Sequence, residues 1–255
     1  MKKIIQIVML AGVMTLAFSA CKKEETQDPP ASQFGDFKLV FDAVWAANMD
    51  PFFMNAQIFH PKTGDSLTFT TFKFYVSNIK LKKSDGTLWE ANESYHLVDL
   101  ADPTRLTFDF TNIPAGTYTG VLLTMGVDSA RNVSGNQDGD LDPVLGMYWN
   151  ATDGYIMIKA EGQAPQSPTG TFAYHLGGFS GPDKVVMDRD INFPTSGPLT
   201  ISANSTPNLH IVVNPARLFH SYGSVTNGPE ILAPGFDAAT MAFTFNDWVR
   251  FSQIN

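Results

Sequence analysis

The chain has 255 residues, a formal net charge of −8 and a single cysteine. The acidic balance argues against nucleic acid as a partner, because binding to the phosphate backbone requires a basic surface. With one cysteine the chain can form neither an internal disulfide nor a thiolate metal cluster.

The N-terminal residues 1–20 have the pattern of a lipoprotein signal peptide. Lys2 and Lys3 precede an apolar run over residues 4–18, and small residues then lead into Cys21. The run is short for a membrane span and fits the hydrophobic part of a secretory signal. We therefore expect Cys21 to be lipidated and to anchor the chain at the outer membrane, facing the periplasm or the cell surface. The alternative is a secretory signal with an incidental cysteine.

The rest of the chain predicts a tether followed by one domain. Residues 21–34 are polar and contain prolines, which is typical of a flexible tether. Residues 35–255 are within the range of one all-β domain, and short strand-like segments alternate there with Pro, Gly and Asn. This pattern favours an antiparallel β-sandwich-like domain with short helices in its connections. We expect strands at 37–44, 68–81, 95–100, 106–110, 118–127, 185–188, 199–202 and 209–213.

Local signals refine this prediction. The alternation of the second strand breaks at residues 77–78, which indicates a β-bulge. The dipeptide Asp85-Gly86 predicts a hairpin turn after that strand. The remaining local predictions are a turn at 113–118 and short helices near 216–219 and 240–245.

Oxygen-bearing side chains recur at alternate positions in the loop that follows strand 118–127. The candidate calcium ligands are Asp128, Asn136, Asp138, Asp140 and Asp142. Ca²⁺ takes about six to eight oxygen ligands, and such a run can supply several of them. The loop is not an EF-hand, because Leu141 stands where that motif needs glycine. The alternative is a set of Asx turns in which these side chains cap their own backbone.

Six segments of the chain resemble the sequence motifs of one known family, and they occur in the same order. They read KFYVSNIKL, YHLVD, IPAGTYTGVLLTMGVDSARNVSG, GDLDPVLGMYWN, GYIMIKAEG and YHLGGF. Together they resemble the MbnP-like family, over about residues 35–253. The resemblance implies a β-sandwich-like fold and a copper ion held by histidines. It also implies a tryptophan that a partner di-haem enzyme, of the peroxidase-like kind, oxidises to kynurenine.

The resemblance assigns positions to particular residues. His175 stands at the histidine of the family's HLG motif, and Trp149 stands at the first tryptophan of its aromatic motif, which Gly154 and Tyr155 complete. Ala151 replaces the second tryptophan of that motif. None of the four tryptophans has a histidine within two residues. This departure weakens the expectation of an oxidised tryptophan, and the di-haem partner depends on that mechanism.

Imidazole is a suitable donor for copper, and the chain has five histidines. The candidate metal ligands are His175, Trp149, His210 and His96. No two histidines have a spacing that makes a metal site by itself, so a site must assemble across strands. The alternative is that each histidine is a hydrogen-bonded part of the fold and that Trp149 is a core or pocket-wall residue. His60 and His220 are expected to be solvated.

Two functional hypotheses follow, and neither is enzymatic. The chain lacks the nucleotide-binding, hydrolase and zinc-protease motifs, so we expect no catalytic role. The first hypothesis is a lipid-anchored copper-binding protein. The second is a non-catalytic surface binding or adhesion module for a glycan or an envelope protein, favoured by the tether and by aromatic residues expected to be exposed (Trp45, Phe52 and Phe53).

Overall fold

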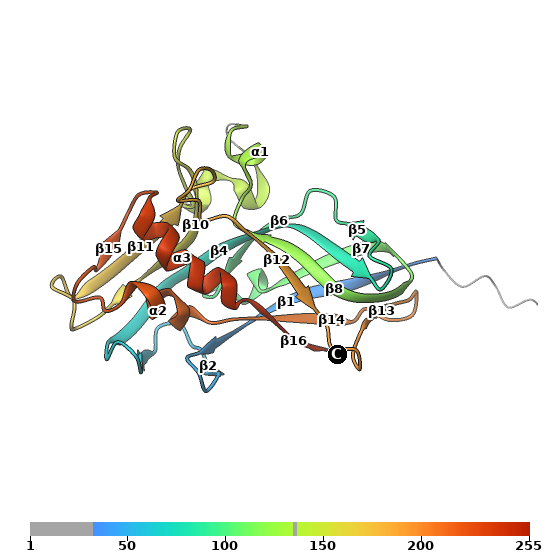
Figure 1. The fold of residues 1–255 in the computed structure, drawn as a ribbon, viewed down its shortest axis with the longest axis horizontal. Helices are drawn as coiled ribbons and strands as arrows, with labels where there is room; N and C mark the ends of the chain where they lie inside the picture. The colour runs from blue at the N-terminus through green and yellow to red at the C-terminus, as the bar shows by residue number, and fades with distance from the viewer. Residues whose placement is uncertain (1–32, 135–136) are drawn as a thin grey trace, which may run out of the picture. The chain divides into compact units, whose positions relative to one another are not determined.

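One long strand, β4 (Ser66–Lys83), organises the computed structural model (Figure 1). The structure describes residues 33–134 and 137–255, which form one compact unit. The predicted signal peptide and Cys21 lie outside the described residues. Side chains alternate along β4, so Phe72 and Phe74 are buried in the core while Lys73 lies on the opposite face.

The larger sheet extends from β4 in both directions. Its direct partners are β3 (Gln57–Phe59), β5 (Leu88–Glu90), β6 (Tyr95–Asp99), β8 (Gly116–Met125) and β10 (Gly154–Gln163). The outer strands are β9 (Tyr148–Asn150) and β11 (Thr171–Gly177) on β10, β12 (Met187–Asn192) and β13 (Leu199–Ile201) on β8, and β15 (Glu230–Ile231) on β11. Strand β4 therefore connects segments from most of the described chain.

The smaller sheet is centred on β1. Its strands are β1 (Phe34–Trp45), β2 (Asp50–Pro51), β7 (Thr107–Pro114), β14 (Asn208–Val213) and β16 (Arg250–Ile254). Strand β1 pairs with β7 in the antiparallel sense and with β14 in the parallel sense. Strands β11 and β15 are also parallel. The predicted β-sandwich-like fold is confirmed, with the correction that its sheets are mixed and not purely antiparallel.

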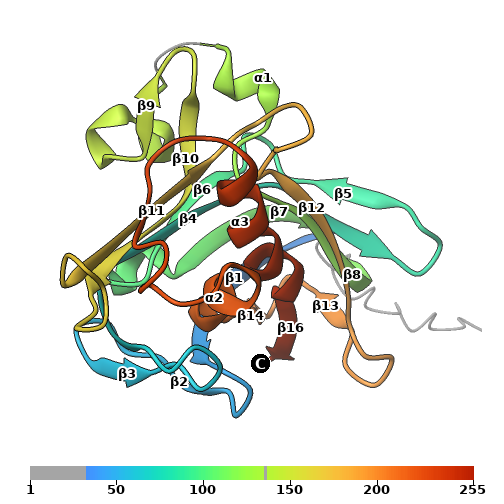
Figure 2. The same cartoon turned by 60° about the vertical axis from the view of Figure 1, so that its left-hand side comes forward.

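The core lies between the inner faces of the two sheets and continues beneath a helix. Phe41 of β1 meets Phe74 of β4 edge to face, with 5.7 Å between the ring centroids. Helix α3 (Phe236–Trp248) lies over the same face of the larger sheet (Figure 2). Its Phe245 packs against Phe72 and Phe74. Burial of one such side chain stabilises the fold by about 1.5–3 kcal/mol. These aromatic contacts therefore fix how the layers pack.

Most of the local predictions are confirmed. The register between β4 and β8 shifts between Ser77 and Lys80, where Asn78 has a φ of 53°, so the bulge is present. The hairpin turn at Gly86 joins β4 to β5. The turn predicted at 113–118 is present but tighter than expected: the chain bends at Ala115, the one residue between β7 and β8. The rest of the predicted segment is taken up by strand pairing, of Ile113 and Pro114 with β1 and of residues 116–118 with β13.

Short helices occupy the connections. The two predicted helices are confirmed as η4 (Pro215–Leu218) followed by α2 (Phe219–Tyr222), and as α3. The others are η1 (Pro103–Arg105), α1 (Ser129–Asn132), η2 (Gly139–Leu141) and η3 (Pro143–Leu145). Within the described residues, none of the helices combines the length and the apolar character that a membrane crossing requires.

Candidate functional site

The loop between β8 and β10 covers part of the outer face of the larger sheet. The hydroxyl of Tyr75 donates a hydrogen bond to the carbonyl of Asp140 at 2.9 Å, and that of Tyr155 donates to the carbonyl of Leu141 at 2.7 Å. Burial raises the pKa of Tyr155 to about 12, so it stays a neutral donor at pH 7. The loop is thus fixed to the sheet by two tyrosines from neighbouring strands.

Asn132 makes a second attachment of this loop. Its side chain is buried, and its Nδ2 donates to the carbonyls of Val127 and Asp128 at 2.5 and 2.9 Å. Its Oδ1 accepts from the backbone N–H of Tyr155 at 2.9 Å. One amide therefore satisfies backbone groups on both sides of the loop, which a buried polar side chain must do to avoid a desolvation penalty.

Asp128, the first predicted calcium ligand, is a helix cap. Its carboxylate accepts from the backbone N–H of Ala130 at 3.0 Å and from Asn78 Nδ2 and the Tyr95 hydroxyl, both at 2.8 Å. Partial burial raises the pKa of Asp128, but the hydrogen bonds from Asn78 and Tyr95 outweigh burial and lower it overall. The carboxylate is charged at pH 7 and is already stabilised by protein donors.

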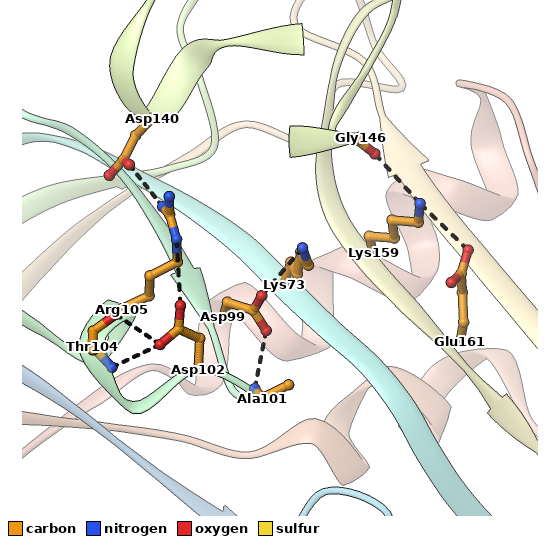
Figure 3. A network of polar contacts seen from close by, with 10 residues as sticks. All are labelled: Lys73, Asp99, Ala101, Asp102, Thr104, Arg105, Asp140, Gly146, Lys159 and Glu161. Carbon is orange, nitrogen blue, oxygen red and sulfur yellow. Dashed lines mark hydrogen bonds and ion pairs between the residues drawn. The ribbon is translucent and has the colours of Figure 1, made fainter. Parts of the chain in front are cut away.

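Asp140 links the loop to β6 and η1. One carboxylate oxygen accepts from Arg105 Nη1 at 2.7 Å, and the other accepts from the backbone N–H of Leu97 at 3.0 Å. The Arg105 and Asp140 side chains are both about a quarter exposed. Figure 3 shows this pair beside the turn in which Asp102 accepts from the backbone N–H of Thr104.

Of the remaining predicted calcium ligands, the structure describes Asp138 and Asp142. Asp142 caps η3 by accepting from the backbone N–H of Val144 at 2.9 Å, and Asp138 precedes η2 without a side-chain cap bond. Asn136 lies outside the described residues. Over residues 33–134 and 137–255, no three His, Cys, Asp or Glu side chains form a group that could hold a metal ion. Calcium binding stays a prediction.

Trp149 lies on the outer face of the larger sheet, against a glycine. It belongs to β9, is half-buried, and its ring packs so closely on Gly177 of β11 that a methyl group there would collide with ring atom Cζ3. Gly177 and His175 are two residues apart in β11, so their side-chain positions lie on the same face. The structure therefore places Trp149 and His175 on one surface, although 26 residues separate them in the sequence.

His175 forms a pair with Glu161 of β10. Its Nε2 lies 2.6 Å from Glu161 Oε1, and Lys159 Nζ lies 3.5 Å from the same oxygen. Partial burial raises the pKa of Glu161, but the hydrogen bond from His175 and the charge of Lys159 outweigh burial and lower it overall. Because a charged carboxylate can only accept, Nε2 of His175 carries the proton and donates it. Nδ1 of a neutral His175 is then left with its lone pair.

A row of charged side chains crosses the sheet beside this pair. Lys73 is directly opposite Lys159 in the β4–β10 ladder and opposite Asp99 in the β4–β6 ladder. Lys73 forms an ion pair with Asp99 at 3.1 Å, and Lys159 also donates to the carbonyl of Gly146 at 3.4 Å (Figure 3). Each lysine therefore has a carboxylate partner, which offsets the repulsion between two like charges that face each other.

The sequence did not identify Glu161 as the partner of His175. Lys159 is directly opposite His175, and Glu161 is two residues further along the same face. The signal that could have shown this is the hairpin register, in which Gln163 pairs with Thr171. Segment 164–170 has the Pro, Ser and Gly residues of a hairpin connection, so counting back from it brings Glu161 close to His175.

His210 lies on the other sheet, and His96 lies on an edge of the larger one. Nδ1 of His210 donates to Asp42 Oδ2 at 2.8 Å on the outer face of the smaller sheet. His96 packs against Phe108 at 4.5 Å between ring centroids, and its Nδ1 is 4.0 Å from Asp140 Oδ2, beyond hydrogen-bonding distance. Burial lowers the pKa of His96, and the opposing charge of Asp140 does not cancel this effect.

His60 contradicts the prediction of a solvated side chain. It is 3% exposed, its Nδ1 accepts from the backbone N–H of Thr63 at 3.1 Å, and its Nε2 therefore donates to the carbonyl of Ala216 at 3.0 Å. Burial is the largest influence on its pKa, which is lowered. The prediction failed because the covering residue, Ala216, is distant in sequence. His220 is exposed, as predicted.

Two of the three aromatic residues expected on the surface are buried. Trp45 and Phe52 are 3% and 8% exposed, and they stack on each other with 5.7 Å between ring centroids. The indole N–H of Trp45 donates to the carbonyl of Phe59 at 2.9 Å, which satisfies its polar atom inside the core. Only Phe53 is exposed, at 66%.

Comparison with known proteins assigns the chain to a family. A sequence model of the MbnP family matches residues 34–233, most of the chain, so the chain belongs to the MbnP family. Among solved structures, it is similar to MbnP from Methylosinus trichosporium, with a TM-score of 0.51 and 14% sequence identity. That alignment covers 75% of this chain and 80% of the other. At this identity the likeness shows the fold alone. A search of curated proteins gives no match.

Proposed function

We propose that this member of the MbnP family is a lipid-anchored envelope protein that binds a copper ion with His175 as its main imidazole donor. The single observation that supports this most strongly is the pairing of His175 with Glu161 at 2.6 Å, on the sheet face that Trp149 covers. Lipidation of Cys21 would hold the chain at the outer membrane. A di-haem peroxidase-like partner belongs to the proposal only if Trp149 is oxidised.

The physical argument is that Glu161 prepares His175 for a metal. A histidine that ligates a metal usually donates its other ring N–H to a carboxylate, which fixes the ring and the tautomer. Glu161 does this at Nε2, and Nδ1 is the atom that would bind copper. Imidazole nitrogen suits both Cu(I) and Cu(II). His210 and His96 lie on other elements, so they are weaker candidates for the same ion.

The test is copper binding by the purified full chain in detergent. We expect the wild type to retain copper after dialysis, with nitrogen hyperfine structure in the electron paramagnetic resonance spectrum of bound Cu(II). His175→Ala should abolish retention, and Glu161→Gln should weaken it by about 10- to 100-fold, because it removes the orienting carboxylate. His220→Ala, which removes an exposed histidine elsewhere, is the matched control.

Two outcomes would contradict the proposal. One is a wild-type chain that retains no copper, and the other is equal retention by wild type and His175→Ala. Oxidation of Trp149 is a separate question, which the intact mass answers: conversion to kynurenine adds one oxygen and removes one carbon. An unchanged mass after copper loading would remove the di-haem partner from the proposal while leaving the imidazole site.

The alternative function, a non-catalytic surface binding or adhesion module, is favoured by exposed apolar side chains. Phe53 and Phe236 are exposed by 66% and 71%. Binding to a glycan array or to isolated envelope proteins, lost in Phe53→Ser and unaffected by removal of copper, would support this alternative. Wild-type binding that requires copper would exclude it.

A further inference from the structure

A small basic pocket lies where the end of β1 meets η4 and α2. Figure 2 shows α2 well away from α1 and β9. The basic pocket has a volume of about 140 Å³ and is lined mainly by Ala46, Ala47, Pro61, Lys62, Arg217 and His220. Its walls are thus formed by small apolar side chains, and nitrogen-bearing side chains stand around them. This combination differs from the charged row on the larger sheet, where each lysine has a carboxylate partner.

The cations of the basic pocket have no carboxylate partner among the described residues. Lys62 Nζ donates to the carbonyl of His220 at 2.5 Å, which is a neutral acceptor. Arg217 stacks on the ring of Trp248 at 5.1 Å, and Arg250 stacks on the same ring at 4.9 Å. In a chain with a formal net charge of −8, such a cluster of uncompensated positive charge is unexpected.

The electrostatic environment of His220 is also dominated by positive charge. Desolvation lowers the pKa of His220, and the positive charges of Lys62 and Arg217 lower it further. Asp65, whose charge acts on the neighbouring His60, is buried and has other donors: it accepts from the hydroxyl of Ser224 at 2.7 Å and from the backbone N–H of Val225 at 3.2 Å. An external anion would supply the missing negative charge.

The walls of the basic pocket are held in place before any ligand binds. Ala46 has a φ of 53°, a left-handed conformation that is costly for a residue with a Cβ. The side chain of Asn214 holds it there, accepting from the N–H of Ala46 at 3.1 Å and donating to its carbonyl at 2.9 Å. At the base, His60 is fixed to Thr63 and to the carbonyl of Ala216. Preorganisation of this kind lowers the entropic cost of binding.

We propose that the basic pocket binds a small organic anion, a carboxylate attached to a short aliphatic group. The planar guanidinium of Arg217 matches the two oxygens of a carboxylate, and Lys62 adds a second charge-assisted donor. The aliphatic group would lie against Ala46, Ala47 and Pro61. This inference is independent of copper binding, because none of the pocket residues belongs to the face that carries His175 and Trp149.

The probe is butyrate, titrated into the purified full chain by calorimetry or by chemical-shift changes. We expect saturable binding. Arg217→Gln should weaken it by about tenfold or more, and Lys62→Gln by about three- to tenfold, since each removes a charge-assisted hydrogen bond. Arg250→Gln is the matched control: it stacks on the same tryptophan but does not line the basic pocket, so affinity should change by less than about twofold.

Further probes separate this site from a merely basic surface. Butyramide has the same shape without the charge, and inorganic phosphate has the charge without the aliphatic group; both should bind at least about tenfold more weakly. Ala47→Leu, at an exposed position of the lining, should block butyrate while leaving the cations and the melting temperature unchanged. Equal binding of butyramide, equal binding of phosphate, or an Ala47→Leu chain that binds butyrate normally would each overturn the proposal.

Discussion

Two regions of the molecule rest on a buried asparagine but differ in how their charges are balanced. Asn132 fixes the loop on the outer face of the larger sheet, and Asn214 fixes the end of β1 beside the basic pocket; both are 1% exposed. Near Asn132, Asp128 and Asp140 are saturated by protein donors. In the basic pocket the cations have no carboxylate partner among the described residues. The carboxylates Asp128 and Asp140 of the first region thus have protein donors, whereas the cations of the second region are arranged for an external anion.

The largest effect is expected from Asn214→Ala. It should lower the free energy of unfolding by about 2–4 kcal/mol, because the N–H and the carbonyl of Ala46 lose their partner and η4 loses its cap. Urea unfolding measures this. Asn227→Ala, at an exposed position, is the control and should change stability by less than about 0.5 kcal/mol. A loss below about 1 kcal/mol for Asn214→Ala would show that the backbone of Ala46 does not need its hydrogen bonds to Asn214.

The counterpart substitution, Asn132→Ala, separates the two regions. We expect a loss of about 1–3 kcal/mol, since buried backbone groups of the loop and the N–H of Tyr155 lose their partner. Butyrate affinity should be unchanged, because the loop does not line the basic pocket. If Asn132→Ala weakened butyrate binding as strongly as Arg217→Gln does, the two regions would be coupled and the comparison would fail.

Gly177→Ala tests how Trp149 packs on the larger sheet. A methyl group there collides with the Trp149 ring, and the expected loss is about 1–3 kcal/mol of unfolding free energy. In the double variant with Trp149→Ala, the collision with the ring is gone and only the close approach to the carbonyl oxygen of Tyr155, at 2.9 Å, remains. The combined loss should therefore be smaller than the sum of the single losses. Gly197→Ala, where an added Cβ would meet only Pro194 at 3.8 Å, is the control. If the losses of unfolding free energy in the two single variants simply added in the double variant, Trp149 would not pack against residue 177.

The smallest expected effect is a dependence of stability on pH through His60. Burial lowers the pKa of His60 from its ordinary value of 6.5, so between the two values the unfolded chain binds more protons than the folded one. The stabilisation is therefore fully present above about pH 6.5 and declines as the pH falls toward the folded-state pKa. Urea unfolding from pH 8 to pH 5.5 should show this decline, and His60→Gln should make it shallower. Parallel profiles for the two chains would contradict the assignment.

The features that the sequence predicted correctly are those set by neighbours along the chain. The strand around Phe72 and Phe74, the bulge at Asn78 and the hairpin at Gly86 all follow from local periodicity and turn chemistry. For the acidic loop, the alternative of side chains that cap their own backbone describes Asp128 and Asp142 correctly. Each accepts from a backbone N–H two residues further along the chain, so this contact is local in sequence.

The features that the sequence missed depend on contacts between distant segments. His60 and Trp45 were expected at the surface, and both are covered by side chains or backbone that only the folded sheets bring near. The same limit applies to the candidate sites. The family resemblance singled out His175 and Trp149, but Glu161 required the β10–β11 register, and the basic pocket required η4 to meet the end of β1.

The parallel pairing of β1 with β14 has a consequence for the order of folding. Strand β1 begins at Phe34, whereas its partner spans Asn208–Val213 and is itself paired with β16 at Arg250–Ile254. The smaller sheet therefore cannot close until nearly the whole chain is available, and the loop to be closed exceeds 150 residues. Contacts so distant in sequence slow folding, because chain entropy is lost before they form. We infer that β4 and its hairpin partners assemble first and that the two ends of the domain meet last.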